Sequence, residues 1–328
     1  MKGRTAMNKL TPCTPETLPC VQNVLNYLAN LEGNGIILGQ HTQTVPQEEL
    51  VRINKITGKL PALCGFELLA YSPNINKNAI DDPHCIAEIN ANENTVEKAF
   101  EWAEKGGLVT FTWHWFSPLY GNNKSFYARN TEFDARKAVI DGTPENTALI
   151  SDMDKIAGIL SEFRDRRIPV LWRPFHEADG DWFWWGVHGA DTVKKLWRIM
   201  FERYVNFHKL NNLIWVWNTP VREFYPGNEY CDIISRDIYP EAHIHSDLAE
   251  KYNELMEITD VSKPAAIGEI GAIPGIEMLS QSRVPWLWFM TWSGEFALTE
   301  KHTTNEELIK AYNHDYAVTL DKLPKLSV

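Results

Sequence analysis

The sequence predicts a (β/α)8 barrel, the TIM-barrel fold, that forms a single domain. Eight short apolar segments, each typical of a buried strand, follow one another along the 328 residues and are mostly separated by helical stretches. They are continuous apolar runs, as expected of parallel strands covered on both faces. No GxGxxG phosphate-binding loop follows an early segment, which disfavours the alternative of a doubly wound open sheet. The number of segments and the chain length both fit a barrel.

The apolar runs locate the individual elements. We expect strands at 36–40, 60–68, 108–115, 169–175, 212–219, 232–239, 264–271 and 285–292. Apolar residues at helical spacing predict helices at 16–31, 96–104 and 147–166, and a further helix with Asp191 as its N-cap. Residues 17–328 therefore make up the predicted domain. Residues 1–16 lack an apolar segment, and we expect a loosely ordered leader or a segment left from expression.

Composition narrows the classes of partner. The net charge of −11 argues against nucleic acid or an anionic membrane surface and leaves neutral ligands open. The five cysteines include no CxxC pair, and the histidines form no HExxH motif, so we expect neither a disulfide scaffold nor a metal or other cofactor. No apolar run approaches about 18 residues, the length that spans a membrane. We expect a monomer, and the sequence leaves its cellular location open.

The run from Pro169 to Gly186, PVLWRPFHEADGDWFWWG, differs from the rest of the chain. It begins as a buried strand and then places Arg173, His176 and Glu177 directly before four consecutive aromatic residues. A packed aromatic loop would explain the aromatics but not the charges, because unpaired buried charge is costly. Polar groups beside flat apolar rings suit a sugar, whose hydroxyls need polar partners and whose C–H faces pack on aromatic rings. We interpret this run as part of a carbohydrate site.

Polar and aromatic residues also lie where other predicted strands end. These are Glu67, Tyr71, His114, Asp237, Tyr239, Glu269 and Trp292. In a barrel, the carboxyl ends of the strands meet at one face, and active sites lie there. Glu269 stands between glycines in the apolar run IGEIG, which favours a position facing a ligand over a structural glutamate paired with Arg173. We expect Glu67 and Tyr71 to contact substrate, and Trp215 and Trp217 to pack outside the barrel.

Glu177 and Glu269 follow strands four and seven, which lie opposite each other in an eight-stranded barrel. Two carboxyl groups facing each other are the arrangement used in glycoside hydrolysis, in which one is protonated and the other ionised. We expect Arg173 to keep Glu269 charged. We also expect the aromatic wall beside Glu177 to raise the pKa of that carboxyl.

The chain resembles glycoside hydrolase family 26, the β-mannanases, from Gly39-Gln40-His41 to Trp292. The resemblance rests mainly on RPFHE at 173–177 with WFWWG at 182–186, and on IGEIG at 267–271. It implies a retaining double displacement with Glu177 as acid/base and Glu269 as nucleophile. It further implies a central sugar subsite lined by His114, His176, Trp182, Phe183, Tyr239 and Trp292. The implied enzyme is extracellular, needs no metal, and attacks β-1,4-mannan, glucomannan or galactomannan internally.

Two alternatives to a mannanase stay open. Some members of the family cleave mixed-linkage β-glucan or β-1,3-xylan, and here Trp292 is followed by Ser293, where many mannan-active relatives carry a bulkier or basic residue. From a different class, the chain could be a carbohydrate-binding barrel without catalysis, although a pure binder has no need of both glutamates. We expect residues 116–146, rich in Asn, Tyr and Phe, to build further subsites.

Overall fold

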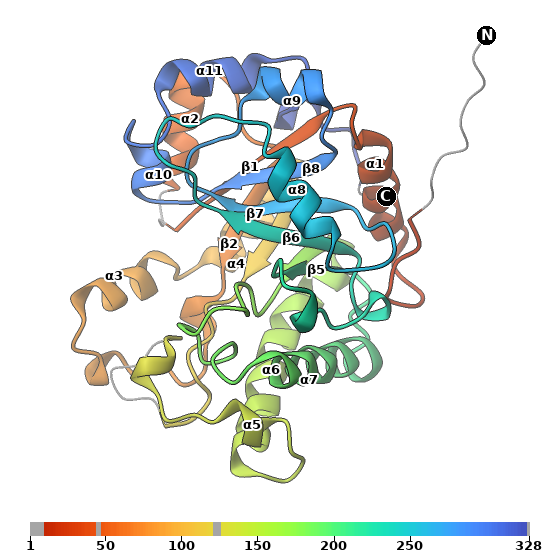
Figure 1. The fold of residues 1–328 in the computed structure, drawn as a ribbon. Helices are drawn as coiled ribbons and strands as arrows, with labels where there is room; N and C mark the ends of the chain where they lie inside the picture. The colour runs from red at the N-terminus through yellow and green to blue at the C-terminus, as the bar shows by residue number, and fades with distance from the viewer. Residues whose placement is uncertain (1–9, 44–46, 121–125, 327–328) are drawn as a thin grey trace.

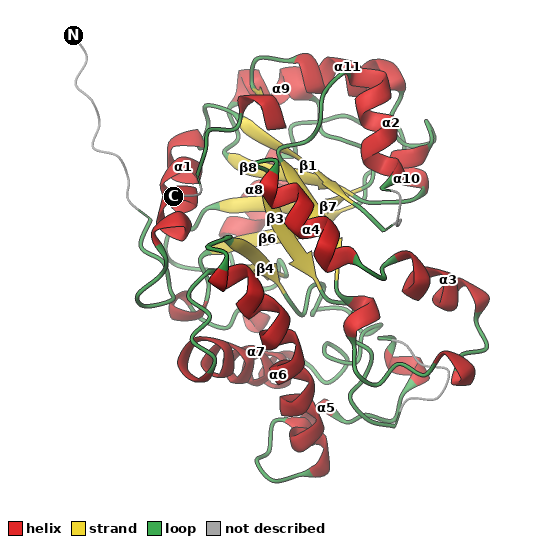
Figure 2. Cartoon of the chain, turned by 180° about the vertical axis from the view of Figure 1, so that it is seen from behind, coloured by secondary structure: helices red, strands yellow, loops and turns green. Residues whose placement is uncertain are grey.

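The computed structural model describes residues 10–43, 47–120 and 126–326, and it is a closed barrel of parallel strands surrounded by helices (Figures 1 and 2). The strands are β1 Ile36–His41, β2 Leu63–Glu67, β3 Leu108–Thr112, β4 Val170–Arg173, β5 Leu213–Asn218, β6 Ile233–Ile238, β7 Ala265–Ile270 and β8 Trp286–Thr291. Each pairs in parallel with the next, and β1 pairs with both β8 and β2, which closes the barrel. The predicted (β/α)8 fold is confirmed.

Eleven α-helices lie in the described part of the chain. They are α1 Pro19–Leu31, α2 Glu48–Thr57, α3 Pro83–Ala91, α4 Thr95–Glu104, α5 Ala135–Ala138, α6 Pro144–Asp165, α7 Ala190–Glu202, α8 Ala249–Met256, α9 Ile276–Ser282, α10 Glu295–Leu298 and α11 Asn305–Asn313. A short strand, β9 Ala317–Val318, pairs with the start of β1. None of the helices in the described residues is long and apolar enough to cross a membrane.

The predicted boundaries differ from the observed ones for identifiable reasons. The N-cap of α7 is Gly189 and not Asp191, which lies in the first turn and pairs with Lys194. A negative charge is favourable there because it faces the positive end of the helix dipole. Strands β3 and β4 end at Thr112 and Arg173, before the predicted 115 and 175. The residues beyond them have left the sheet and form the rim of the barrel.

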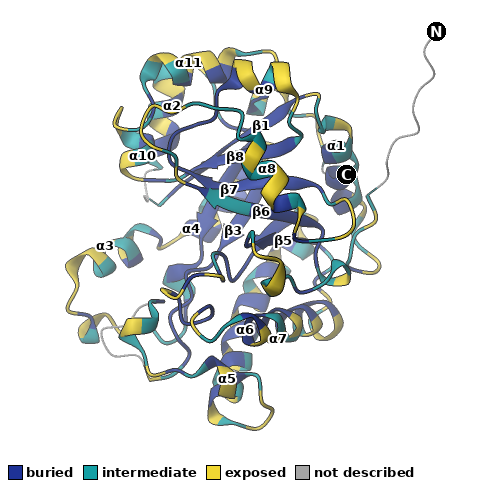
Figure 3. Ribbon diagram, in the orientation of Figure 1, coloured by how far each residue is buried: buried dark blue, intermediate teal, exposed yellow. Residues whose placement is uncertain are grey.

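The barrel interior is packed separately from the layer between strands and helices. Alternate strand residues, such as Ile37, Leu171 and Ile214, form one buried cluster with the apolar face of α1, whereas their neighbours along the strands pack against the outer helices. The strands are accordingly mostly dark blue in Figure 3. Helix α1 therefore closes the amino-terminal end of the barrel and leaves the carboxyl end for a site. Trp215 and Trp217 lie in the outer layer, as predicted.

A bulge on β7 determines which way Glu269 points. Arg236 on β6 is paired with Ile267, but the next residue, Asp237, is paired with Glu269, so Gly268 is an extra residue on β7. Ile267 packs in the outer layer, and Glu269 would lie on that same side if the strand alternated regularly. The extra residue reverses the alternation. Glu269 therefore faces the barrel interior beside Asp237, and Ile270 returns to the outer layer.

The start of the described chain lies against the barrel. The backbone N–H of Cys13 donates to the Asp232 carboxylate at 2.6 Å, and Gln22 donates to the carbonyl of Leu10 at 3.0 Å. Leu10 and Cys13, in the segment that we expected to be loosely ordered, thus contact the folded domain. Residues 1–9 of that segment lie outside the described residues.

Asp152 on α6 is predicted to destabilise the fold at alkaline pH. Burial raises the pKa of this carboxyl from its ordinary value of 3.8 to about 7. A raised pKa means that the folded state holds the proton more tightly than the unfolded state, so stability falls as pH rises from about 4 to about 7. Asp152→Asn keeps an oxygen to accept the Trp115 indole N–H, now 2.9 Å from the carboxylate. We expect it to raise the free energy of unfolding at pH 8 by on the order of 1–3 kcal/mol.

Asp154→Asn, on the same helix, is the matched control for thermal denaturation at pH 8 and pH 4. Asp154 accepts two hydrogen bonds of 2.7 Å from Arg203, so its replacement should lower the melting temperature at pH 8. The gain from Asp152→Asn should disappear near pH 4. A lower melting temperature of Asp152→Asn at pH 8 would contradict the assignment of a buried, penalised carboxylate.

Candidate active site

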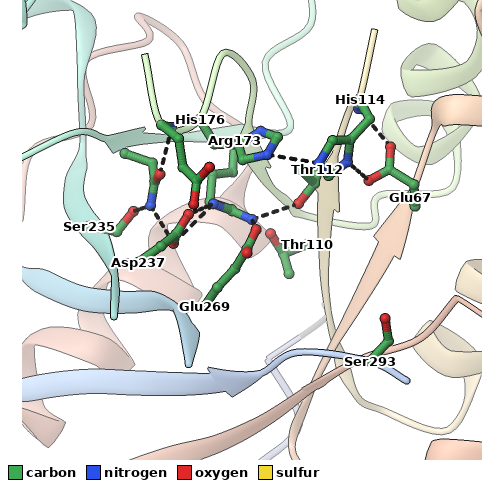
Figure 4. Close-up of polar contacts among 12 residues, drawn as sticks. Glu67, Thr110, Thr112, His114, Arg173, His176, Ser235, Asp237, Glu269 and Ser293 are labelled. Atoms are coloured by element: carbon green, nitrogen blue, oxygen red, sulfur yellow. Dashed lines mark hydrogen bonds and ion pairs between the residues drawn. The ribbon is translucent and has the colours of Figure 1, made fainter. Parts of the chain in front are cut away.

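The guanidinium of Arg173, at the end of β4, is the central group at the carboxyl end of the barrel (Figure 4). Its side chain is 4% exposed and donates to Asp237 at 3.1 Å, to Thr112 Oγ1 at 3.1 Å, and to Glu269. Burial alone would lower the pKa of Arg173, but the Asp237 and Glu269 carboxylates raise it above its ordinary value. Arg173 is therefore a permanent cation that connects β3, β4, β6 and β7.

Glu269 is held from two sides. Arg173 donates to Oε1, and the Tyr239 hydroxyl donates to Oε2 at 2.6 Å. Burial and the Glu269 carboxylate raise the pKa of Tyr239, which keeps its hydroxyl protonated as a donor. Two donors on one carboxylate stabilise its negative charge and fix its orientation.

Glu177 lies just after β4 in a different environment. Its Oε2 accepts a hydrogen bond of 2.9 Å from the Trp182 indole, and its backbone N–H donates to Asn218. Burial and the neighbouring Glu269 charge raise the pKa of Glu177. Phe175 and Glu177 both have φ of 51°, in the left-handed region that is unfavourable for residues other than glycine. Such strain is typical of functional sites, and here it turns the Glu177 side chain into the site.

The two glutamates lie close together. One oxygen each of Glu177, Asp237 and Glu269 lies within 4.8 Å of the others. Three carboxylates at this spacing could hold a metal ion, but two of them already share the Arg173 guanidinium as an ion-pair partner. The expectation of a metal-free site therefore stays our prediction. A carboxyl with a raised pKa beside a carboxylate held by two donors can supply a proton and a nucleophile to the same bond.

Two histidines with opposite pKa shifts lie beside the carboxylates. His114 donates from Nδ1 to Glu67 Oε2 at 2.6 Å. Burial alone would lower the pKa of His114, but the Glu67 carboxylate outweighs this and raises it to about 9. His176 has its Nε2 3.1 Å from Nε2 of His114. Burial, together with the positive charges of His114 and Arg173, lowers the pKa of His176 well below its ordinary value. The pKa values of the two adjacent rings are therefore shifted in opposite directions.

Aromatic rings surround these polar groups. Trp292 stacks on His41 with ring centroids 4.3 Å apart, and Phe183 packs against both His114 and His176. Trp182 and Tyr239 are 45% and 46% exposed, so each is partly open to solvent beside the carboxylate to which it donates. Of residues 116–146, the part from Phe126 to Tyr127 packs on Phe183, and residues 121–125 lie outside the described residues.

Glu67 and Tyr71, which we expected to contact substrate, make contacts within the protein. Glu67 is fully buried and bonded to His114, so it is in contact with that ring and not with the open face of the site. The Tyr71 hydroxyl lies 3.4 Å from the Glu97 carboxylate at the start of α4 and makes no hydrogen bond with Arg173 or either histidine. The spacing of residues at strand ends identified these positions, but it does not tell a side chain that faces a ligand from one that supports a neighbour.

Three residues that our site prediction omitted belong to the same cluster. Asp237 pairs with Arg173, Asn218 donates to Asp237 at 2.8 Å, and His41 stacks under Trp292. The sequence held a signal for Asp237 and Asn218, since both stand at the ends of predicted strands. His41 follows the Gly39-Gln40 pair but showed no partner in the sequence.

Gly268 offers a test of this geometry. A Cβ added there would lie 2.5 Å from both Asn218 Nδ2 and Asp237 Oδ1, and 3.3 Å from Arg173 Nη1. We expect Gly268→Ala to displace the Arg173 network and to reduce catalytic activity at least tenfold. The matched control is Gly158→Ala on α6, where an added Cβ meets nothing within 4 Å. That variant should keep its activity and gain up to about 1 kcal/mol in unfolding free energy. Full activity of a folded Gly268→Ala would contradict the requirement for this network.

Comparisons with known proteins agree with this geometry. The model of glycosyl hydrolase family 26 matches residues 13–322. A mannan endo-1,4-β-mannosidase of Thermothelomyces thermophilus is 37% identical over 91% of this chain and 60% of the relative. Mannan endo-1,4-β-mannosidase A of Piromyces is 32% identical over 99% of this chain and 53% of the relative. The chain thus spans between half and two thirds of the length of these curated relatives.

Two solved structures share the fold over nearly the whole chain. A β-(1,4)-mannanase of Podospora anserina superposes with a TM-score of 0.88 at 33% identity, covering 100% of this chain and 72% of that one. A β-mannanase from a symbiotic protist of the termite Reticulitermes speratus, solved with a gluco-manno-oligosaccharide, gives a TM-score of 0.86 at 31% identity, covering 96% and 98%. The family match, the relatives and the barrel agree, and the chain belongs to glycosyl hydrolase family 26.

Proposed function

We propose that this protein is a retaining endo-β-1,4-mannanase, with Glu177 as acid/base and Glu269 as nucleophile. The observation that carries the proposal is the separation of the two carboxyl groups, which have oxygens within 4.8 Å of each other. Retaining glycosidases hold their carboxyls about 5–5.5 Å apart, whereas inverting enzymes need about 6.5–9.5 Å to admit a water molecule. The names of the curated relatives and the family match support the substrate class.

The mechanism follows from the unequal environments of the two groups. In the first step, an oxygen of Glu269 attacks the anomeric carbon while Glu177 gives its proton to the departing glycosidic oxygen. The sugar is then bound covalently to Glu269. In the second step, Glu177 takes a proton from water, the water oxygen attacks the anomeric carbon, and the bond to Glu269 breaks. Each step leaves Glu177 in the protonation state that the other step requires.

The charge on Glu269 adjusts Glu177 between the two steps. In the free enzyme that charge contributes to the raised pKa of Glu177, which keeps the acid protonated. Once Glu269 is esterified, its charge is gone and the pKa of Glu177 falls, so the same group becomes a base. Arg173 and Tyr239 donate to Glu269 in the free enzyme and orient it for attack.

A mannan or mannooligosaccharide is the proposed partner, and the protein acts as a monomer without a cofactor. His114, His176, Trp182, Phe183, Tyr239 and Trp292 are the proposed residues of the central sugar subsite. Ser293 is 2% exposed and donates to Gln43, so it projects little beyond Trp292. Ser293 is uncharged and therefore offers no ionic contact to the next sugar, where a bulkier or basic residue is expected in many mannan-active relatives. Mixed-linkage β-glucan is for this reason the second substrate to test.

The substrate class is tested by reducing-sugar release from galactomannan, glucomannan, linear mannan, barley β-glucan and β-1,3-xylan. We expect release from the three mannan-type polymers. Release from barley glucan alone would keep the two glutamates but reject the mannanase assignment. If the folded protein released no reducing sugar from any of the five polymers, the result would favour a carbohydrate-binding barrel without catalysis.

The two glutamates are tested by azide rescue. With an activated aryl β-mannoside, Glu269→Ala should lose activity by about 10³-fold or more and regain it with azide, giving the α-mannosyl azide. Glu177→Ala should keep the first step on this substrate, whose leaving group needs no proton, and give the β-mannosyl azide. The β-azide from Glu269→Ala together with the α-azide from Glu177→Ala would show that the two residues have the opposite roles. Full activity of either variant would show that the replaced residue is not catalytic.

A further inference from the structure

We propose that Glu67 is a positioning residue, which keeps both ring nitrogens of His114 protonated and thereby maintains a cation beside the Glu177–Glu269 pair. Glu67 itself is fully buried and contacts no open part of the site. The protonation of His114 rests on its contacts with Glu67 and His176 and on the lowered pKa of His176. Only its effect on catalysis rests on the proposed function.

The two oxygens of Glu67 have different partners. Oε1 accepts the backbone N–H groups of Leu69, at 2.9 Å, and of His114, at 2.8 Å. Oε2 accepts from the ring Nδ1 of His114 at 2.6 Å. A carboxylate can only accept hydrogen bonds, so Nδ1 must carry a proton.

The second ring nitrogen of His114 faces another histidine. Its Nε2 lies 3.1 Å from Nε2 of His176, so one of the two must donate. Burial and the nearby cations lower the pKa of His176, so it is the neutral partner. A neutral imidazole can donate or accept at Nε2, and we assign the donor role to Nε2 of His114. His114 then donates at both nitrogens and is an imidazolium, in agreement with its raised pKa of about 9.

Charged groups of both signs surround the His114 ring. The anionic side chains acting on it are Glu67 from β2, Glu88 from α3 and Glu269 from β7. Two further histidines lie nearby, His41 from β1 and His176 after β4. Burial lowers the pKa of both, and the charge on His114 lowers it further. Glu67 is the one among these anions with a described hydrogen bond to the ring. It is therefore the group whose loss should change the protonation of His114.

The cation on His114 acts on the catalytic pair. It counteracts the raised pKa of Glu177 and is attracted to Glu269. The Arg173 guanidinium acts from the barrel interior, so the two cations bracket the carboxylates. Without the charge on His114, the pKa of Glu177 would rise further, and proton donation to the leaving group would become harder.

The contacts of Glu67 make Glu67→Gln a sharp test. Two backbone N–H groups point at Oε1, so the amide oxygen must take that place and the amide nitrogen must face Nδ1 of His114. An amide nitrogen only donates, so Nδ1 has to lose its proton. Nε2 can keep its proton and its bond to His176. The substitution thus preserves every hydrogen bond and removes one proton.

The direct measurement is ¹⁵N NMR of histidine-labelled protein without substrate, with His114 assigned by its absence from His114→Asn. In the wild type at pH 7, both ring nitrogens of His114 should be protonated. In Glu67→Gln at pH 7, Nδ1 should be unprotonated and Nε2 protonated. A neutral His114 in the wild type, or a folded Glu67→Gln with both nitrogens protonated, would overturn the proposal. If the variant does not fold, the wild-type spectrum decides.

Glu88→Gln is the matched control. Glu88 also acts electrostatically on His114, but its described hydrogen bond joins it to Gln43 at 3.3 Å. The His114 ring should remain doubly protonated at pH 7 in this variant. Loss of a ring proton in Glu88→Gln as readily as in Glu67→Gln would show that overall charge, and not the Glu67 contact, determines the state of His114.

The catalytic consequence is read from the pH profile of kcat/KM on a mannooligosaccharide. In Glu67→Gln, the alkaline limb, where Glu177 loses its proton, should move to higher pH, because a cation that lowers the pKa of Glu177 has been removed. A merely structural role would reduce activity and leave the limb in place, which would overturn the effect on catalysis. If the wild type hydrolyses no mannan, the proposed function fails, whereas the NMR result still decides the state of His114.

Discussion

The buried ion pairs of Arg173 are the interaction on which the site depends. A buried guanidinium is tolerated only when its charge is paired and its donors are used. Asp237 and Glu269 supply the charges, and Thr112 accepts a further bond. Because these partners lie on β6, β7 and β3, one cation holds the ends of four strands in a fixed relation. Removing Arg173 would leave two buried carboxylates without their cation inside the barrel.

The β7 bulge is the backbone feature that makes this pairing possible. Without the extra residue at Gly268, Glu269 would face the outer layer with Ile267. A side chain at that position would meet Asn218 and Asp237, so the residue that shifts the strand must also be small. The same position thus directs Glu269 into the barrel and leaves room for the groups that hold it.

Protonation is divided among neighbouring groups by their immediate contacts. His114 and His176 are adjacent, yet the Glu67 carboxylate raises the pKa of the first, whereas burial and the nearby positive charges lower the pKa of the second. Glu177 and Glu269 are likewise adjacent, and the donors lie on Glu269 while burial and repulsion act on Glu177. The site separates the states of like groups by a few directed hydrogen bonds, which works in a buried setting because the dielectric screening is weak.

The fold and the closeness of Glu177 and Glu269 could be predicted from the sequence, because apolar runs mark strands and the carboxyl ends of parallel strands meet at one face of a barrel. Strand alternation could not predict that Glu269 faces inward, since regular alternation places it outside and the bulge depends on pairing with β6. The role of Glu67 also lay beyond the sequence, because a carboxylate at a strand end reads the same whether it meets a sugar or a histidine. Asp237 was visible as a strand-end residue, but its pairing with Arg173 needed the closed barrel.

The central claim is that Glu269 forms a covalent bond to the sugar, and the anomer first released from a mannooligosaccharide tests it most directly. Proton NMR can follow hydrolysis by the unaltered protein before the products mutarotate. Two successive inversions at the anomeric carbon predict that the β-anomer appears first and the α-anomer follows only as mutarotation proceeds. Initial release of the α-anomer would mean a single displacement by water and would contradict the assignment of Glu269 as nucleophile.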